Sequence, residues 1–322
     1  MTKKELIFLF LIERLLTKIT DTNTKMNFNT KNVDFVWIAA LLVLLLGLNA
    51  CEEKDYAAII LNMEADTTLM DTSYMVGEIP AKQDKIVVIE EFSGVACVNC
   101  PQGAKKVEEI IEAYPGRVIS TTMHAGGFAE PFANSQEDFA IDETEDLNTF
   151  FTVSGYPAAV IDRAIFDGQA QEAIAANLTS WEVFTEERLQ LETPVNLTVT
   201  MEYNDETRRL KARVEAVYTN TVEAEHKLSV FLVESGIIDL QDDIDLGLVE
   251  DYEHNHVVRD MLTASRGIVL YEGTKEAGLM VVREFSIVLA DNWKPENCEV
   301  LTFVHESADS KEIVQGAKVK VE

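Results

Sequence analysis

The chain has 322 residues, a formal charge of −29, 47% hydrophobic residues and no stretch of low complexity. This length suffices for two ordinary domains with packed cores. Nucleic-acid binding requires concentrated lysine and arginine, so 27 basic against 56 acidic residues argue against a nucleic-acid partner.

Residues 1–50 predict a targeting segment that is not part of the fold. The apolar stretch 36–48 is short for a membrane-spanning helix and runs into the sequence L-N-A-C at 48–51, the pattern of a bacterial lipobox. We therefore expect cleavage before Cys51, lipidation of that cysteine and attachment of the mature protein to a membrane. Met1 and Met26 both stay open as the translation start.

Residues 51–83 predict a polar tether with a short strand or two, and residues 84–191 then alternate strands with helices. This alternation predicts an α/β domain, a mostly parallel sheet covered by helices. The expected strands are 85–92, 117–123 and 158–162, and the expected helices are 102–113, 136–150 and 171–188.

Residues 192–322 predict an all-β domain. Short segments alternate apolar and polar residues and are divided by turn signals, which indicates an antiparallel β-sandwich of the immunoglobulin-like type. Only the stretch around 239–266 has no clear pattern. The expected strands are 195–203, 210–218, 228–233, 285–289, 300–305 and 313–321.

A C-x-x-C-P motif, Cys97 to Pro101, follows the first expected strand and opens the first helix. There is no second cysteine pair to complete a zinc site, so we expect neither a metal nor a cofactor. A dithiol at a helix start has a lowered thiol pKa, because the helix dipole and free N–H groups stabilise a thiolate. Together with the later G-Y-P at 155–157, the motif is typical of thiol–disulfide oxidoreductases.

These residues resemble the thioredoxin family over 85–162. The resemblance implies that Cys97 is an exposed nucleophile, Cys100 a buried resolving thiol and Pro157 a cis-proline. It also implies that Glu91, six residues before Cys97, is a buried acid, which would accept the proton of Cys100. The alanine before the motif and the Val-Asn pair between the cysteines depart from the family pattern.

Three further residues are candidates for the same site. The backbone of Gly155 and Tyr156, just before the proline, is expected to pair with an extended substrate. His124 ends the second strand, and strand ends meet at the active edge of such sheets, so an imidazolium there would lower the thiolate pKa further. The alternative is a histidine that only caps the following glycine turn.

We expect structural roles for three residues of the second half. His254 and His256 alternate and would share one face of a strand, as metal ligands do, but no third ligand is identifiable, which favours a structural pair. Cys298 lies in an apolar strand pattern and is expected to be a buried thiol.

The mature chain, 51–322, resembles a narrower group, the thioredoxin-like lipoproteins related to Omp28 of Bacteroidota. The resemblance rests on C-x-N-C-P and G-Y-P together with segments 123–128, 252–257 and 297–300. It implies an exported outer-membrane protein anchored by lipid on Cys51. The acidic run 52–55 resembles a surface-export signal or is a solvated tether, so the periplasmic and surface faces both stay open.

Three functions are compatible with these features. The first is thiol–disulfide exchange on exported cysteine-containing proteins. The second is a surface binding or adhesion module, with a protein partner and a structural Cys97–Cys100 disulfide. The third is a substrate-capture lipoprotein of a nutrient-uptake complex. Because a two-residue gap closes too small a loop to stabilise a fold much, the motif favours exchange.

Overall fold

The computed structural model describes residues 69–321 apart from 176 and 308–309. The predicted lipobox, Cys51 and most of the tether lie outside the described residues. The described residues form one compact unit.

Residues 84–191 form the predicted α/β half. Strand β2 runs parallel to β3 and antiparallel to β4, and β5 pairs with β4. Helices α4 and α6 pack on one face of these strands through Val107, Ile110 and Trp181, and α5 packs on the other face through Leu147. The elements are β2 (Val87–Ser93), α4 (Cys100–Ala113), β3 (Val118–His124), the 3-10 turn η2 (Gly126–Phe128), α5 (Asp142–Phe150), β4 (Ala158–Ile161), β5 (Ala173–Ala175) and α6 (Leu178–Leu189).

The rest of the chain forms the predicted antiparallel sandwich. One sheet has the order β1-β13-β7-β6, and its apolar face packs against β8, β14 and β15 around residues such as Val214, Val230 and Val300. Strand β1 comes from the segment predicted as a tether with short strands. The elements are β1 (Asp71–Met75), β6 (Val195–Asn204), β7 (Arg209–Tyr218), β8 (His226–Glu234), β11 (Val257–Met261), β12 (Ile268–Val269), β13 (Leu279–Val288), η3 (Pro295–Asn297), β14 (Cys298–Glu306) and β15 (Ile313–Lys320).

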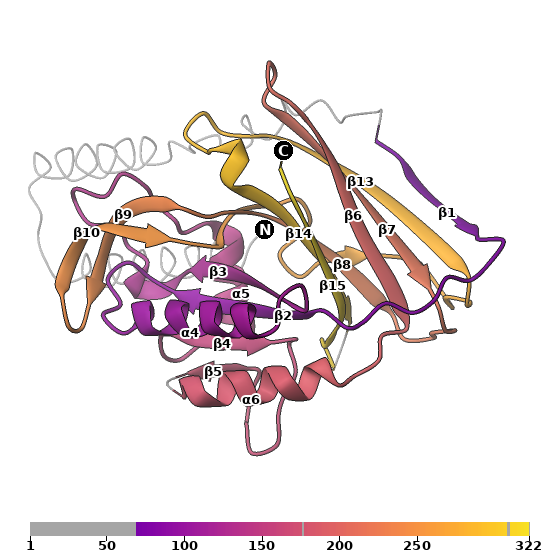
Figure 1. Ribbon diagram of the computed structural model, residues 1–322, viewed down its shortest axis with the longest axis horizontal. Coiled ribbons are helices and arrows are strands. Elements are labelled where there is room, and N and C mark those ends of the chain that lie inside the picture. Colours follow the sequence, from indigo (N-terminus) through magenta and orange to yellow (C-terminus); the bar gives the residue numbers. More distant parts are fainter. Residues whose placement is uncertain (1–68, 176, 308–309, 322) are drawn as a thin grey trace, which may run out of the picture. The chain divides into compact units, whose positions relative to one another are not determined.

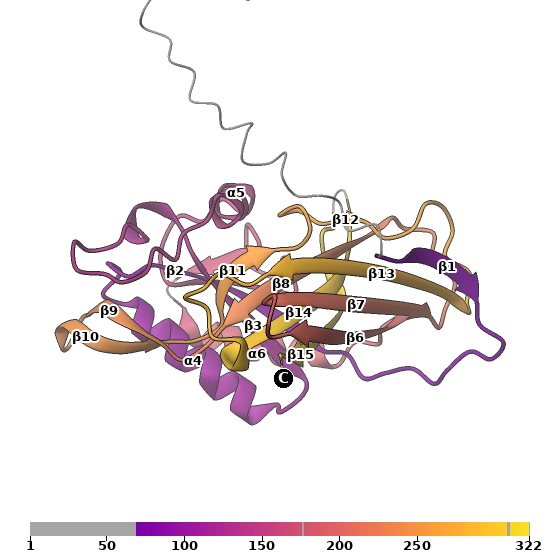
Figure 2. The same cartoon turned by 90° about the horizontal axis from the view of Figure 1, so that it is seen from above.

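The α/β strands and one sheet of the sandwich are a single sheet of nine strands. Its order is β15-β14-β8-β11-β3-β2-β4-β5, with β12 paired to β8. Strand β11 makes the junction, because it runs parallel to β3 on one side and antiparallel to β8 on the other. Figures 1 and 2 show the purple strands of the first half continuing into the orange and yellow strands of the second. The fold class predicted from the sequence is therefore confirmed, and the two halves share one sheet.

Several regions differ from the sequence-based expectation. The helix expected from residue 136 begins only at Asp142, and the strand expected at 285–289 begins already at Leu279. The unclear stretch forms a hairpin of β9 (Ile237–Asp243) and β10 (Gly247–His254), followed by β11. The helix expected from residue 171 begins only at 178, because Ala173 and Ile174 are buried on a strand that pairs with β4. The helical propensity of that alanine-rich segment is overridden by this tertiary pairing.

Candidate functional site

The two cysteines of the C-x-x-C motif form a disulfide between the β2–α4 turn and the first residue of α4. Pro101 follows within the first turn of the helix, where its missing N–H costs little. Cys100 is 2% exposed, as the resemblance implied for a resolving thiol. Cys97 was expected to be exposed, but it is 3% exposed, so the expectation of an open nucleophile is wrong for this disulfide form.

The predicted cis-proline is confirmed, since the Tyr156–Pro157 peptide bond is cis. The proline packs against the first turn of α4 at Gly103, where an added Cβ would lie 2.6 Å from the Pro157 Cβ. Only glycine allows this approach of helix and loop. Tyr156 donates its hydroxyl hydrogen to Asn148 Oδ1 at 2.6 Å. A substrate role for its backbone, or for that of Gly155, stays a prediction.

Glu91 is 1% exposed and lies beside the same helix turn. A Cβ added at Gly103 would be 2.9 Å from Glu91 Oε1, which shows how closely the carboxyl group approaches α4. Its Oε2 accepts a hydrogen bond from Thr122 Oγ1 at 3.2 Å. Its Oε1 has no hydrogen-bond partner among the described residues. Burial raises the pKa of Glu91 to about 8, and Glu108 contributes to the rise. Near neutral pH this carboxyl group can therefore both hold and release a proton.

His124 is 1% exposed, and its ring packs against Phe139 and His254, with ring centroids 4.8 and 5.5 Å apart. Burial, then the neighbouring His254 and Arg259, hold the pKa of His124 well below its usual value. The ring is therefore neutral at pH 7, and the expected imidazolium is wrong. A role of the neutral ring in exchange stays a prediction.

His254 and His256 do not share a strand face, contrary to expectation. His254 ends β10 and is buried, which lowers its pKa to about 4. His256 lies in the next turn with a left-handed φ of 57°, and its Nε2 is 3.1 Å from Glu108 Oε1 on α4. Because of the turn between β10 and β11, the His254 ring packs against His124, whereas the His256 ring faces Glu108 on α4.

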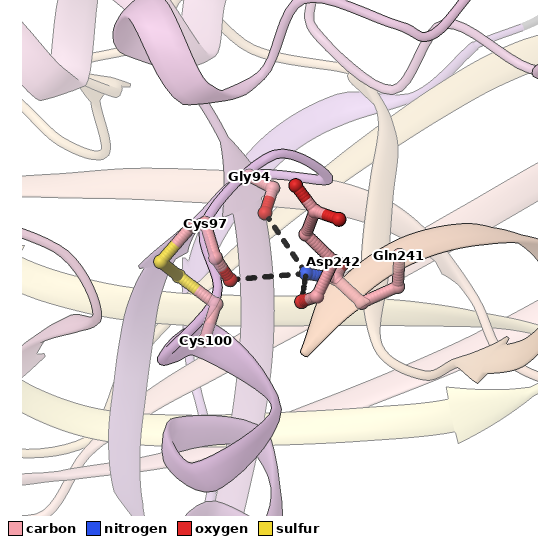
Figure 3. The surroundings of a disulfide bond; sticks show 5 residues. All are labelled: Gly94, Cys97, Cys100, Gln241 and Asp242. Atoms are coloured by element: carbon pink, nitrogen blue, oxygen red, sulfur yellow. Dashed lines mark hydrogen bonds between the residues drawn. A yellow bond between two sulfur atoms is a disulfide. The ribbon is translucent and has the colours of Figure 1, made fainter. Parts of the chain in front are cut away.

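Gln241 of β9 belongs to this site, although no motif in the sequence pointed to it. Its side-chain amide donates to the carbonyl oxygens of Cys97 at 3.1 Å and Asp242 at 2.9 Å, and it also contacts that of Gly94 (Figure 3). Two backbone hydrogen bonds continue this contact, from the N–H groups of 242 and 244 to the carbonyls of Val95 and Val98. The hairpin thus holds the cysteine turn from a place 144 residues away in sequence.

The remaining predicted residues lie away from this site or outside the described part. Cys298 is a buried free thiol whose pKa is raised to about 12, chiefly by burial, as the apolar strand pattern predicted. Cys51 lies outside the described residues. Within 69–321, apart from the gaps, no three His, Cys, Asp or Glu side chains are grouped to hold a metal ion.

The comparisons with known proteins give the family. The family model described as "Outer membrane protein Omp28" matches residues 144–322, more than half of the chain. The chain belongs to the Omp28 family. Comparison with curated proteins gives no match. In the described part of this Omp28-family chain, no helix combines the length and the apolar character that a membrane span needs.

Solved structures place the fold. HBP35 of Porphyromonas gingivalis has a TM-score of 0.60 with 16% identity, and the match covers 76% of this chain and 77% of that chain. At this identity the likeness shows a shared fold. A domain of the outer membrane lipoprotein Omp28 from Porphyromonas gingivalis also matches, with 20% identity over 40% of this chain and 89% of that domain, at a TM-score of 0.27.

Replacing Gln241 tests whether the hairpin holds the cysteine turn. In Gln241→Leu the buried carbonyls of Gly94 and Cys97 lose the amide donor and each keep one backbone N–H donor, so we expect the free energy of unfolding to fall by about 0.5–1.5 kcal/mol. We also expect dithiothreitol to reduce the disulfide several-fold faster, measured by acid quench and mass spectrometry. Gln102→Leu, on the exposed side of α4, is the matched control. A reduction rate equal to that of the wild type would contradict this role.

The raised pKa of Glu91 predicts a pH dependence of stability. Between about pH 5 and 8 the folded state keeps a proton that the unfolded chain has released. The free energy of unfolding should therefore fall as pH rises through this window, by up to about 1.4 kcal/mol per pH unit. Denaturant unfolding of Glu91→Gln should lose this slope, and the exposed control Glu112→Gln should keep it. Equal slopes in wild type and Glu91→Gln would refute the assignment.

Proposed function

We propose that this Omp28-family chain is a thiol–disulfide exchange protein that acts on exported cysteine-containing proteins. The observation that carries the proposal is a disulfide at the start of α4, whose first turn also contacts the buried Glu91 and the cis-proline. We further propose that a lipid on Cys51 attaches the chain to the outer membrane. The periplasmic and surface faces are both compatible with this anchor.

The exchange reaction uses these groups in a balanced sequence. In the dithiol form the Cys97 thiolate attacks a substrate disulfide, forms a mixed disulfide and releases one substrate thiolate. Cys100 then gives its proton to the Glu91 carboxylate and attacks Cys97 Sγ, which closes the disulfide and releases the second substrate thiolate. The substrate disulfide is reduced by two electrons and the cysteine pair is oxidised by two. The reverse sequence oxidises a substrate dithiol.

The surroundings of the cysteine turn suit a polypeptide substrate. Apolar side chains stand exposed at Val98 within the motif, at Phe128 of η2 and at Ile244, whose N–H bonds to the carbonyl of Val98. Exposed apolar groups that gather around a reactive centre are typical of interaction sites. They favour extended or unfolded chains as substrates.

A binding module with a structural disulfide is the second candidate. The observation in its favour is the near-complete burial of both cysteines together with the Gln241 contacts that hold their turn. In this alternative the cysteines never form a mixed disulfide, and the sandwich half carries the partner contacts.

Trapping of mixed disulfides separates the two functions. In Cys100→Ser the resolving thiol is missing, so Cys97 should stay covalently joined to its substrates. We expect thiol-sensitive, high-molecular-weight adducts in cell envelopes, visible on non-reducing gels and identifiable by mass spectrometry.

The matched controls are Cys97→Ser, which keeps Cys100 but lacks the attacking thiol, and the double variant. Both should give no adducts. If Cys100→Ser gives no more adducts than these controls while all variants accumulate equally, the binding module is the better account.

A further inference from the structure

A cavity of about 260 Å³ lies between α4, the end of β10 and the turn that leads to β11. Its wall joins Glu91 and Thr122 of the central strands to Glu108 of α4 and to Tyr252 and His256 of the second half. The exchange reaction, as proposed above, uses Glu91 but leaves the rest of this wall without a role.

At its inner end the cavity meets an unsatisfied acid. Glu91 Oε1 is buried and has no partner among the described residues, whereas Oε2 is held by Thr122. Buried polar atoms without a protein partner are usually satisfied by ordered water. Each water occupies about 30 Å³ in the liquid, so the cavity has room for several between Glu91 and the outer wall.

At its outer end the cavity meets the His256–Glu108 pair. The His256 side chain is 15% exposed and that of Glu108 is 41% exposed, so the pair reaches from the cavity wall to solvent. An imidazole can accept a proton on one nitrogen and release one from the other, which a carboxylate relay alone cannot do.

The backbone fixes His256 to β3, the strand whose Thr122 side chain bonds Glu91. The Thr122 N–H donates to the His256 carbonyl at 2.6 Å, and the His256 N–H donates to Ser235 Oγ at 3.0 Å. Thr122 therefore bonds Glu91 through its side chain and His256 through its backbone. The left-handed φ of His256 is a conformation that non-glycine residues rarely keep without such contacts.

We propose that this cavity is the proton route of the exchange site, with His256, paired to Glu108, as the relay between Glu91 and solvent. The proposal rests on the proposed function. When Cys100 attacks, its proton passes to Glu91. Water in the cavity carries it from the Glu91 carboxyl to the His256 imidazole, and the imidazolium releases it to bulk water. One proton leaves for each Cys97–Cys100 disulfide that closes, and no electron is transferred in these steps. When the Cys97–Cys100 disulfide is reduced, the proton moves along the same route from solvent to Cys100.

Among the ionisable groups of the cavity wall, His256 with its partner Glu108 is the one suited to relay a proton. Burial, with Glu91 and other acids nearby, raises the pKa of Tyr252 to about 12, so its hydroxyl keeps its proton at neutral pH. Lys105 and Glu253 have exposed side chains at the rim. His256 lowers the pKa of Glu108 by a hydrogen bond, which keeps this carboxylate ionised as the partner of an imidazolium.

The test is chemical rescue of His256→Asn in the full chain. Asparagine tolerates a left-handed φ and can still bond Glu108, but it cannot carry a proton. The reduced protein is mixed with excess oxidised glutathione, and release of the second glutathione is followed by stopped flow from pH 5 to 9. We expect this step to slow by about tenfold or more, with an altered pH profile, and free imidazole to restore it. Glu108→Gln should slow it less and respond to imidazole in the same way.

The outcomes separate the two proposals. If the wild-type chain does not exchange with glutathione, the proposed function and the relay both fail. If the wild type exchanges and His256→Asn has the same rate and pH profile, only the relay is overturned. A slow His256→Asn that imidazole does not restore shows a structural role and also overturns the relay. Equal thermal unfolding of wild type and variant checks that the fold is kept.

Discussion

The pairing of β11 with β3 is the contact on which the rest of this molecule depends. The ladder is short, with Val257 opposite Thr122 and the Thr122 N–H bonded to the His256 carbonyl. Because β11 also pairs with β8, this contact turns an α/β sheet and a sandwich sheet into one continuous sheet. The hairpin of β9 and β10 comes just before β11, so the junction also brings Gln241 to the cysteine turn and His256 to the cavity beside Glu91.

Buried charges lie at a second place where the two halves meet, after β4 and beside β14. Arg163 forms two 2.7 Å hydrogen bonds with Glu90 of β2, and its guanidinium lies 4.8 Å from the ring centroid of Phe303 on β14. Asp162 pairs with Lys85 at 2.8 Å and with Arg188 at 3.1 Å. Buried ion pairs often add little net stability, because desolvation opposes their attraction, but loss of one partner is costly. They therefore fix the relative position of the strands more than they stabilise the fold.

The sequence predicted the parts whose signals are local. The apolar run of β2, the C-x-x-C-P start of α4 and the G-Y-P before β4 each carry their own signature, and all were found where expected. The buried state of Glu91 followed from its spacing to Cys97 within a known family pattern. Period-two alternation likewise located most sandwich strands, because each has one buried and one exposed face.

What the sequence could not predict depends on contacts between distant segments. The β9–β10 hairpin is rich in acids and has no clear alternation, since one of its strands covers the cysteine turn while the other is largely exposed. Gln241 carries no local motif, and the pattern around His256 suggested a histidine pair on one strand face; only the β11 junction gives the two residues their place. The burial of Cys97 and the neutrality of His124 also follow from long-range packing, which is why the expected open thiol and imidazolium were wrong.

The central claim is that the Cys97–Cys100 pair exchanges electrons with substrates. The most direct measurement is its reduction potential, in graded thiol–disulfide buffers with mass-spectrometric readout of the two forms. We expect a value between about −120 and −270 mV, the range of exchange-active dithiols. A value well below about −300 mV would mark a structural disulfide and would contradict the account.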